Sequence, residues 1–122
     1  MPAMVDSHYY ELEPINGVAT VRFGDTEIVR SKGAVWMREY NGGQAMPPLI
    51  YFPRADVPVD TWEKSGLTTG CPIKGKCEYW AVEVDGQRAA NAMWSYTDVR
   101  PGAENIKDWV SFDGKRFEVS VG

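Results

Sequence analysis

The sequence predicts a mainly β protein: a single compact antiparallel β domain with about seven to nine short strands and one or two short helices. Two observations predict this class. Short runs rich in valine, threonine and aromatic residues recur along the chain, and tight turns containing glycine separate them. Short strands joined by tight turns are typical of antiparallel sheets, whereas parallel sheets need long crossover segments between their strands.

One domain accounts for the whole length. The chain has 122 residues, which is enough to bury a core but too few for two comfortable domains. No internal repeat, low-complexity tract or linker-like change of composition marks a second domain. We therefore expect residues 1–16 to form an N-terminal extended arm and residues 17–122 to form the β domain.

Composition places the chain among soluble globular proteins, with 43 % hydrophobic, 12 % aromatic and 25 % charged residues. No segment approaches the roughly 20 consecutive apolar residues of a spanning helix, so we expect no membrane partner. The first residues lack the basic start and apolar run of a signal peptide, which favours a cytoplasmic location. A net charge of −4 and the absence of a basic stripe argue against a nucleic-acid partner.

In the first half of the chain, two alternating runs at residues 18–23 and 26–30 flank a glycine–aspartate turn, which is the signature of a type II′ hairpin. A third strand is expected at residues 34–40. The apolar run at residues 47–53 is bounded by prolines and fits an edge strand, because proline cannot donate to a ladder. Residues 58–65 have the caps of a short helix, and glycine follows them.

The second half contains the strongest hairpin signal, an aspartate–glycine turn at residues 85–86 between strands at 78–84 and 87–96. After it, a proline start with acid early and lysine late predicts a short helix within residues 100–108. Two closing strands follow, at residues 109–112 and 115–121.

A regular two-residue hairpin loop fixes which side chains face each other. Glu83 then lies opposite Arg88, a favourable opposite-charge pair. Further along, the same register puts Tyr79 opposite Ala92, Cys77 opposite Trp94 and Tyr96 opposite Gly75. One face therefore collects four side chains: Cys77, Tyr79, Trp94 and Tyr96.

The other face is more apolar and is assigned to the core. Its members are Trp80, Val82, Val84 and Met93. A bulge near Asn91 would change part of this register.

Five segments carry a resemblance to a known family. They are residues 52–57 (FPRADV), 69–75 (TGCPIKG), 78–80 (EYW), 92–96 (AMWSY) and 106–112 (IKDWVSF). Over roughly residues 17–121 the chain resembles the small bacterial domain known as domain of unknown function 427. The resemblance implies a compact β-tent domain, a fold shared with zinc-carrying relatives. The family has no established activity, and no residue here supports the nucleotidyltransferase-like label sometimes given to it.

The chain departs from the family pattern at two positions. Ile73 stands where members often have tryptophan, and Cys77 stands where many have a small residue such as alanine. A tryptophan shelf beside the turn is therefore missing here.

The glycine- and proline-rich turn Cys71-Pro72-Ile73-Lys74-Gly75 is the candidate site. Our leading hypothesis is a cytoplasmic small-molecule-binding domain whose pocket this turn forms with the aromatic face. Lys74, together with glycine amides of the turn, would hold an anionic or hydrogen-bond-accepting group of the ligand.

The roles of the remaining candidates stay open. The rings of Tyr79, Trp94 and Tyr96 either form a stacking wall for the ligand or close a second small core beneath the N-terminal arm. Arg54 either contributes to the pocket or pairs with Asp56 on the surface.

Two rival functions remain. The first is an enzyme that uses Cys71 as nucleophile or redox centre. Cys71 lies close in sequence to Lys74 and Lys76, and nearby ammonium groups favour the thiolate form of a cysteine. The opposing interpretation is a buried, inert Cys71. His8 belongs to the predicted arm, which argues against a cysteine–histidine hydrolase. The third hypothesis is a protein-interaction module that docks a partner on its aromatic face.

We expect no metal and no cofactor. Structural zinc wants four nitrogen or sulfur ligands, usually from paired cysteine knuckles, and the chain offers two cysteines six positions apart and one distant histidine. We also expect both cysteines to be reduced in a reducing compartment. The oligomeric state is open, with a homodimer among the choices.

Overall fold

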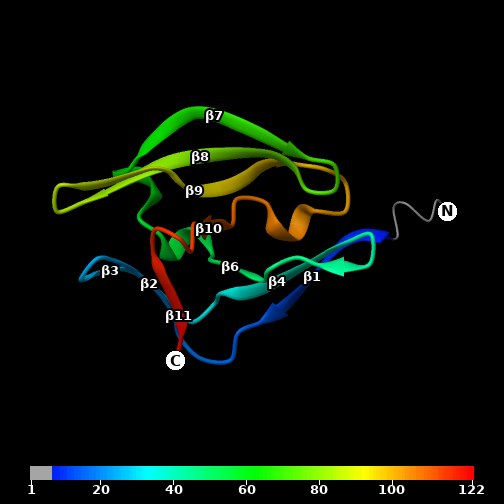
Figure 1. Ribbon diagram of the computed structural model, residues 1–122, viewed down its shortest axis with the longest axis horizontal. Coiled ribbons are helices and arrows are strands. Elements are labelled where there is room, and N and C mark those ends of the chain that lie inside the picture. Colours follow the sequence, from blue (N-terminus) through cyan, green and yellow to red (C-terminus); the bar gives the residue numbers. More distant parts are fainter. Residues whose placement is uncertain (1–6) are drawn as a thin grey trace.

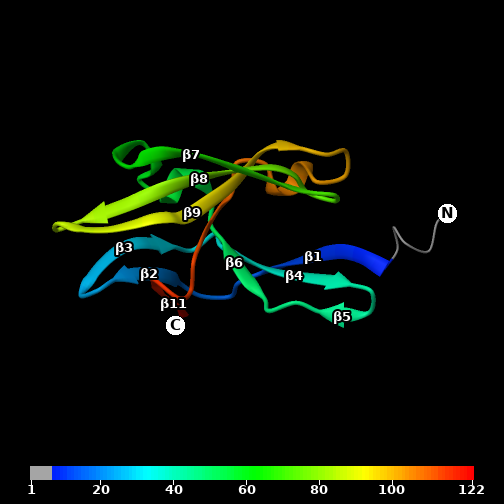
Figure 2. The ribbon, with the colours of Figure 1, turned by 45° about the horizontal axis from the view of Figure 1, so that its top comes forward.

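A computed structural model describes residues 7–122, so the part of the predicted arm at residues 1–6 lies outside the described residues. The chain forms two facing layers of antiparallel sheet (Figures 1 and 2). The fold is mainly β, as predicted, and within residues 7–122 the helices are three single 3₁₀ turns.

Most strands are short. In chain order the strands are β1 (His8–Pro14), β2 (Ala19–Phe23), β3 (Thr26–Ser31), β4 (Val35–Asn41), β5 (Gln44–Ala45), β6 (Leu49–Tyr51), β7 (Glu63–Cys71), β8 (Gly75–Val84), β9 (Gln87–Val99), β10 (Val110–Phe112) and β11 (Glu118–Val121). The long ones are β7, β8 and β9. The three helical turns are η1 (Arg54–Asp56), η2 (Val59–Thr61) and η3 (Glu104–Ile106).

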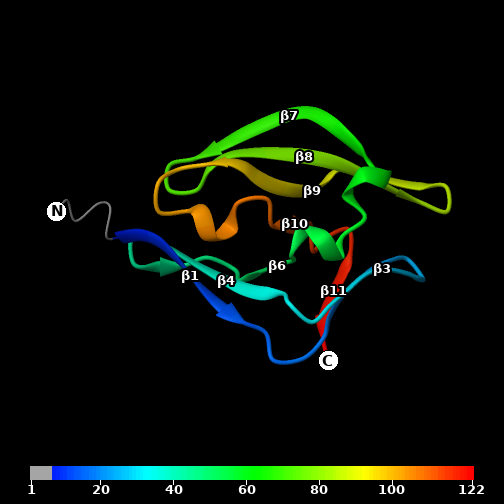
Figure 3. The ribbon, with the colours of Figure 1, turned by 180° about the vertical axis from the view of Figure 1, so that it is seen from behind.

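Three sheets make up the two layers. The upper layer of Figure 1 is a four-stranded sheet in the order β10-β9-β8-β7. The lower layer holds a sheet in which β4 pairs with β1, β5 and β6, and a second sheet in the order β11-β2-β3. Phe52 and Val110 join the layers through an isolated β-bridge, and Figure 3 shows from behind the chain rising from β6 towards β7.

The predicted N-terminal arm is part of a sheet from His8 onward. All seven residues of β1 pair with β4 in a continuous antiparallel register, from His8 opposite Asn41 to Pro14 opposite Val35. Tyr10 and Leu12 pack from this strand against the core. The strand therefore belongs to the same folded unit as the residues after it.

Both predicted helices are shorter than expected. Within residues 58–65 only the turn η2 is helical, and Glu63 already begins β7, which pairs with β8. Within residues 100–108 only η3 is helical. Pairing with an existing strand edge outweighs the weak helical preference of these short segments, because a helix of one or two turns is marginal without packing.

The register of the β8–β9 hairpin agrees with the prediction at its tip and differs further in. Glu83 pairs with Arg88 as predicted, but register shifts put Tyr79 opposite Trp94 and Cys77 opposite Tyr96. One shift lies between Trp80 and Val82, across from Asn91, whose φ of 54° marks the bulge.

The bulge changes partners but keeps the predicted faces. Cys77, Tyr79, Trp94 and Tyr96 still share one face, because directly paired residues of an antiparallel ladder point to the same side. The shifted register therefore changes the cross-strand partner of each residue but not the face on which its side chain lies.

Two hydrophobic clusters fill the space between the layers. The larger contains Val21, Phe52, Trp80, Val82 and Met93, so the predicted core face is confirmed. The smaller lies towards the end where β7 turns into β8, and its buried members are Met37, Tyr51, Cys77, Tyr96, Ala103 and Ile106. The candidate site lies against this second cluster.

Within residues 7–122 no helix has the length and apolar character needed to cross a membrane.

Candidate functional site

The turn between β7 and β8 folds Lys74 inwards. Lys74 is only 5 % exposed, and the backbone amide of Arg100 donates to its carbonyl oxygen over 3.1 Å. Gly75 follows with a φ of 122°, and a Cβ there would lie 2.8 Å from the Cα of Val99. Only glycine fits this close approach, which holds the turn against the end of β9.

The ammonium group of Lys74 is already paired. Its Nζ lies 2.7 Å from Oε1 of Glu39 on β4 and 5.0 Å from the centre of the Tyr96 ring. The sequence predicted that Lys74 would hold an anionic ligand group, whereas the structure shows that a carboxylate of the chain itself lies against it. Lys74 therefore links the two layers.

Glu39 binds a second partner through its other oxygen. The Nε2 of His8 donates to Oε2 of Glu39 over 2.9 Å. Burial alone would raise the pKa of Glu39, but the hydrogen bonds from Lys74 and His8 outweigh it and the net effect lowers this pKa. Glu39 is therefore a carboxylate with both oxygens occupied.

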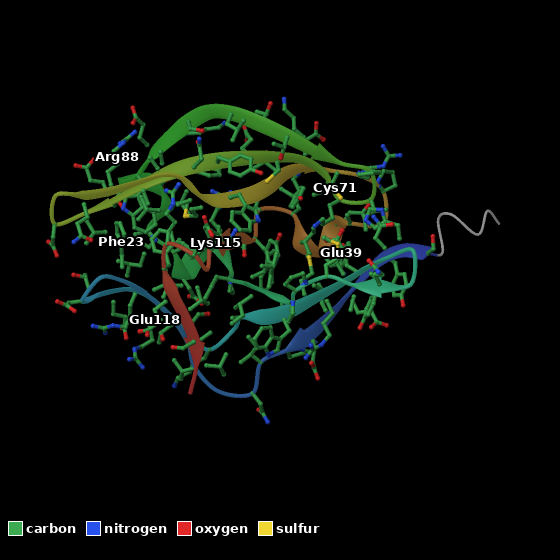
Figure 4. The ribbon with its side chains drawn as sticks, in the orientation of Figure 1. Phe23, Glu39, Cys71, Arg88, Lys115 and Glu118 are labelled. Atoms are coloured by element: carbon green, nitrogen blue, oxygen red, sulfur yellow. The ribbon has the colours of Figure 1, made fainter. Side chains whose placement is uncertain are left out.

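Cys71 completes the cluster. A ring nitrogen of His8, a carboxylate oxygen of Glu39 and the sulfur of Cys71 all lie within 4.8 Å of one another, and the three residues are half-buried. They come from β1, β4 and β7, and Figure 4 shows Glu39 and Cys71 at the same end of the molecule on the facing layers. The sequence placed His8 out of reach of Cys71, and the pairing of β1 with β4 removes that separation.

The aromatic face lies inside the second cluster. Tyr96 is 9 % exposed, and Tyr79 and Trp94 are half-buried. The Trp94 indole N–H donates to the hydroxyl of Tyr51 over 3.2 Å, and the Tyr79 hydroxyl bonds to Thr69. The sequence left two interpretations open, a stacking wall for a ligand or a second small core. The structure shows these rings packed in the small core.

Burial also governs the acidity of groups in this cluster. It raises the pKa of the Tyr51 and Tyr96 hydroxyls far above their ordinary value and raises the pKa of the Cys77 thiol. Cys77 is 1 % exposed, and both cysteines are free. Cys77 therefore packs as a small apolar side chain.

Arg54 contacts residues outside this cluster. Its guanidinium donates to the Ser95 hydroxyl and to the backbone oxygen of Asp108, each over 3.1 Å, and it lies over the ring of Trp80. Asp56, the partner expected from the sequence, instead accepts a hydrogen bond from Ser31. The structure does not bring Arg54 to the Cys71 turn.

Two concave surfaces border the turn. A groove of about 1070 Å³ runs between the start of β1, the turn and the loop after β9; its lining residues include His8, Tyr10, Ile73, Arg100 and Asn105. A shallower hollow of about 580 Å³ is lined by Cys71, Gly75, Lys76 and Asp98, among others.

Arg100 and Pro72 border both surfaces. The predicted aromatic face and Lys74 line neither, so the groove differs from the pocket that the sequence predicted.

Sequence reasoning missed His8, Glu39 and Arg100. The partial signal for Glu39 was its place in a predicted strand that is otherwise largely apolar and aromatic, where a half-buried carboxylate needs a cation. His8 was the single histidine of the chain in a segment with no clear period. No pattern in the sequence showed that these two residues would meet the cysteine-containing turn.

The comparisons with known proteins identify a family without an assigned activity. A search of curated proteins finds no match. Residues 11–122 match the family described as Domain of unknown function (DUF427). This match spans most of the chain and agrees with the resemblance seen in the sequence motifs, so the chain belongs to the DUF427 family.

Proposed function

We propose that this chain is a small-molecule-binding domain whose ligand lies in the groove between β1, the Cys71–Gly75 turn and the loop after β9. The observation that carries this proposal is the groove itself. Its volume of about 1070 Å³ is at the upper end of the size typical of small-molecule sites. Three separate segments form it, so a ligand there would contact both layers.

The lining suggests the character of the ligand. Tyr10, Ile73 and Pro101 offer apolar surface, and Asn105, which accepts a hydrogen bond from the Tyr10 hydroxyl, adds a polar group. Arg100 is exposed, and among residues 7–122 its side chain takes part in no ion pair or hydrogen bond. An anionic or acceptor group would therefore lie against Arg100, a role that the sequence had given to Lys74.

The test uses a mixed library of small carboxylates, phosphates and planar heterocycles, screened against the full chain by ligand-observed NMR. Arg100→Met should weaken binding of an anionic hit about tenfold, because a charge-assisted contact is worth about 1.5–3 kcal/mol and an exposed one lies at the low end. Lys107→Met is the matched control, since Lys107 is exposed just after η3 and does not line the groove.

Equal affinities of the Arg100 and Lys107 variants would remove the groove from consideration. A library that gives no hit at all would also count against a small-molecule site with this lining.

Thiol chemistry at Cys71 is a second candidate, and the proximity of His8 favours it. A ring nitrogen of His8 lies within 4.8 Å of the Cys71 sulfur, near enough to accept the thiol proton after a small adjustment. If this occurs, iodoacetamide should alkylate Cys71 more slowly in His8→Gln than in the wild type. Unchanged alkylation would leave Cys71 without a base and argue against an enzyme of this type.

The interaction-module hypothesis has less support. It required an exposed aromatic face, and that face is packed between the layers.

A further inference from the structure

We propose that His8, Glu39 and Cys71 form a binding site for a divalent transition-metal ion, and that zinc is the ion this donor set fits. This inference goes beyond the proposed ligand groove and does not depend on it. The three donors are an imidazole nitrogen, a carboxylate oxygen and a thiol sulfur. They are the three side-chain donor types found in zinc sites of proteins.

The donors would reach the geometry of a metal site after side-chain movements of up to about 1 Å. The three donor atoms lie within 4.8 Å of one another. Zinc–ligand bonds of about 2.0–2.3 Å in a tetrahedron place ligand atoms roughly 3.3–3.8 Å apart. The distance from His8 Nε2 to Glu39 Oε2 is 2.9 Å, so these atoms would move apart by a few tenths of an ångström, and the metal would replace their hydrogen bond.

The backbone supports this arrangement. His8 pairs with Asn41 and Tyr10 pairs with Glu39. Directly paired residues, and residues two positions apart along a strand, share a face, so His8 and Glu39 project from the same face of the β1–β4 ladder. Cys71 reaches them from the end of β7 in the facing layer. Two layers thus hold the donors, and none of the three is fully exposed.

Lys74 positions the carboxylate. Its ammonium binds Oε1 of Glu39 over 2.7 Å and leaves Oε2 for the metal, in the manner of the outer partners that orient metal ligands. The ammonium also repels a nearby cation, and the negative charges of Glu39 and a Cys71 thiolate offset this repulsion. The four side chains and a divalent ion would together keep a net charge of about one positive unit, which favours an anionic fourth ligand.

The fourth position opens to the concave surfaces. His8 borders the larger groove and Cys71 the smaller hollow. Three protein ligands and one exchangeable position are typical of catalytic zinc, whereas structural zinc is closed by four protein ligands. The sequence prediction of no metal counted only sets of four nitrogen and sulfur ligands, and it had no means of adding Glu39.

The experiment uses the full chain, reduced and treated with a chelator that is then removed. Calorimetric titration with Zn²⁺ should show one ion bound per chain. Titration with Co²⁺ should show a thiolate-to-cobalt charge-transfer band in the near ultraviolet. This band reports sulfur coordination directly and does not depend on any activity.

Variants separate this site from other thiols. Cys71→Ser should abolish the charge-transfer band, and His8→Gln should weaken Zn²⁺ binding at least tenfold. Cys77→Ala is the matched control and should keep both signals, because Cys77 is buried away from solvent. Melting curves of the metal-free variants establish that each one is folded.

The proposal is overturned if the wild type binds Zn²⁺ no more tightly than Cys71→Ser. It is also overturned if the charge-transfer band survives in Cys71→Ser and disappears in Cys77→Ala. Either result would identify the cluster as a metal-free ion-pair network.

Discussion

At the scale of single residues, Lys74 is the clearest case in which burial changes a role. A lysine in a glycine- and proline-rich turn is usually solvated, yet this one is 5 % exposed and lies between Glu39 and the Tyr96 ring. A buried ammonium costs several kcal/mol unless it is paired. Its interaction with Glu39 therefore offsets the cost of burying the ammonium, and Lys74 is not free to bind an anion.

Replacing Lys74 should destabilise the fold strongly. Lys74→Met leaves Glu39 as a largely buried carboxylate without its cation, and breaking a buried pair in this way costs about 3–5 kcal/mol. Urea unfolding followed by tryptophan fluorescence measures the loss. Lys76→Met in the same turn should stay within about 0.5 kcal/mol of the wild type, because Lys76 is exposed.

The double variant Glu39→Gln with Lys74→Met should recover part of the lost stability, since it removes both charges together. If Lys74→Met is as stable as Lys76→Met, the ion pair contributes nothing to folding.

At the scale of elements, the turn from β7 to β8 depends on one glycine. Gly75→Ala would put a Cβ against the backbone of Asp98 and Val99 at a φ of 122°. Strain and overpacking together should cost about 3 kcal/mol or more. Gly70→Ala is the control, because a Cβ there meets nothing within 4 Å. Thermal melting of the two variants compares them, and equal midpoints would show that the turn can open without loss.

Three strands of the upper layer meet at Glu78. Lys64 on β7 and Thr97 on β9 both bond to its carboxylate on β8. The hydrogen bonds from Lys64 and Thr97 lower the pKa of Glu78 below its ordinary value of 4.5. Since the folded state binds this proton less readily than the unfolded chain does, the stabilisation is complete above the unfolded value and is lost as pH falls through the folded value.

The unfolding free energy should therefore fall less steeply in acid when Glu78 is removed. Glu78→Gln should be less stable than the wild type at about pH 7, and the difference should shrink by about pH 3 as the wild-type carboxyl takes up its proton. Lys64→Met should also make the unfolding free energy less dependent on pH in this range, because it removes the cation that pairs with Glu78. A constant gap between wild type and Glu78→Gln across this range would show that the carboxylate charge does not stabilise the fold.

At the scale of the whole molecule, the two layers are joined near their centre and open at one end. Phe52 and Val110 donate to each other's carbonyl oxygens over 2.8 and 2.9 Å, and both side chains are fully buried. By contrast, both residues of β5 are exposed to solvent. The site cluster lies between these extremes, at the end where the layers separate around the groove.

Native-state hydrogen exchange should reproduce this gradient. The amides of Phe52 and Val110 should exchange only through global unfolding, because their bridge cannot open without separating the layers. The amides of β5 should exchange through local opening, with a much smaller free energy. Similar protection at Phe52 and at Gln44 would mean that the layers separate as easily as the hairpin frays.

The sequence by itself determined the fold class and the sorting of side chains onto faces. Alternation along β8 and β9 separated Trp80 and Val82 from Cys77 and Tyr79, and the paired charges of Glu83 and Arg88 set the register at the hairpin tip. These properties are local, because they depend on a two-residue period and on turn chemistry within a few residues. The family motifs added the likeness that the match over residues 11–122 confirms.

Only the tertiary structure decided what surrounds the Cys71 turn. His8, Glu39 and Cys71 are separated by 31 or more positions in the chain, and their approach depends on the pairing of β1 with β4 and on the stacking of two layers. A buried charge takes whichever partner packing brings to it, and sequence spacing does not encode that choice. For this reason the turn was recognisable from the sequence, while the ion pair of Lys74 and the proposed metal donors became visible only in three dimensions.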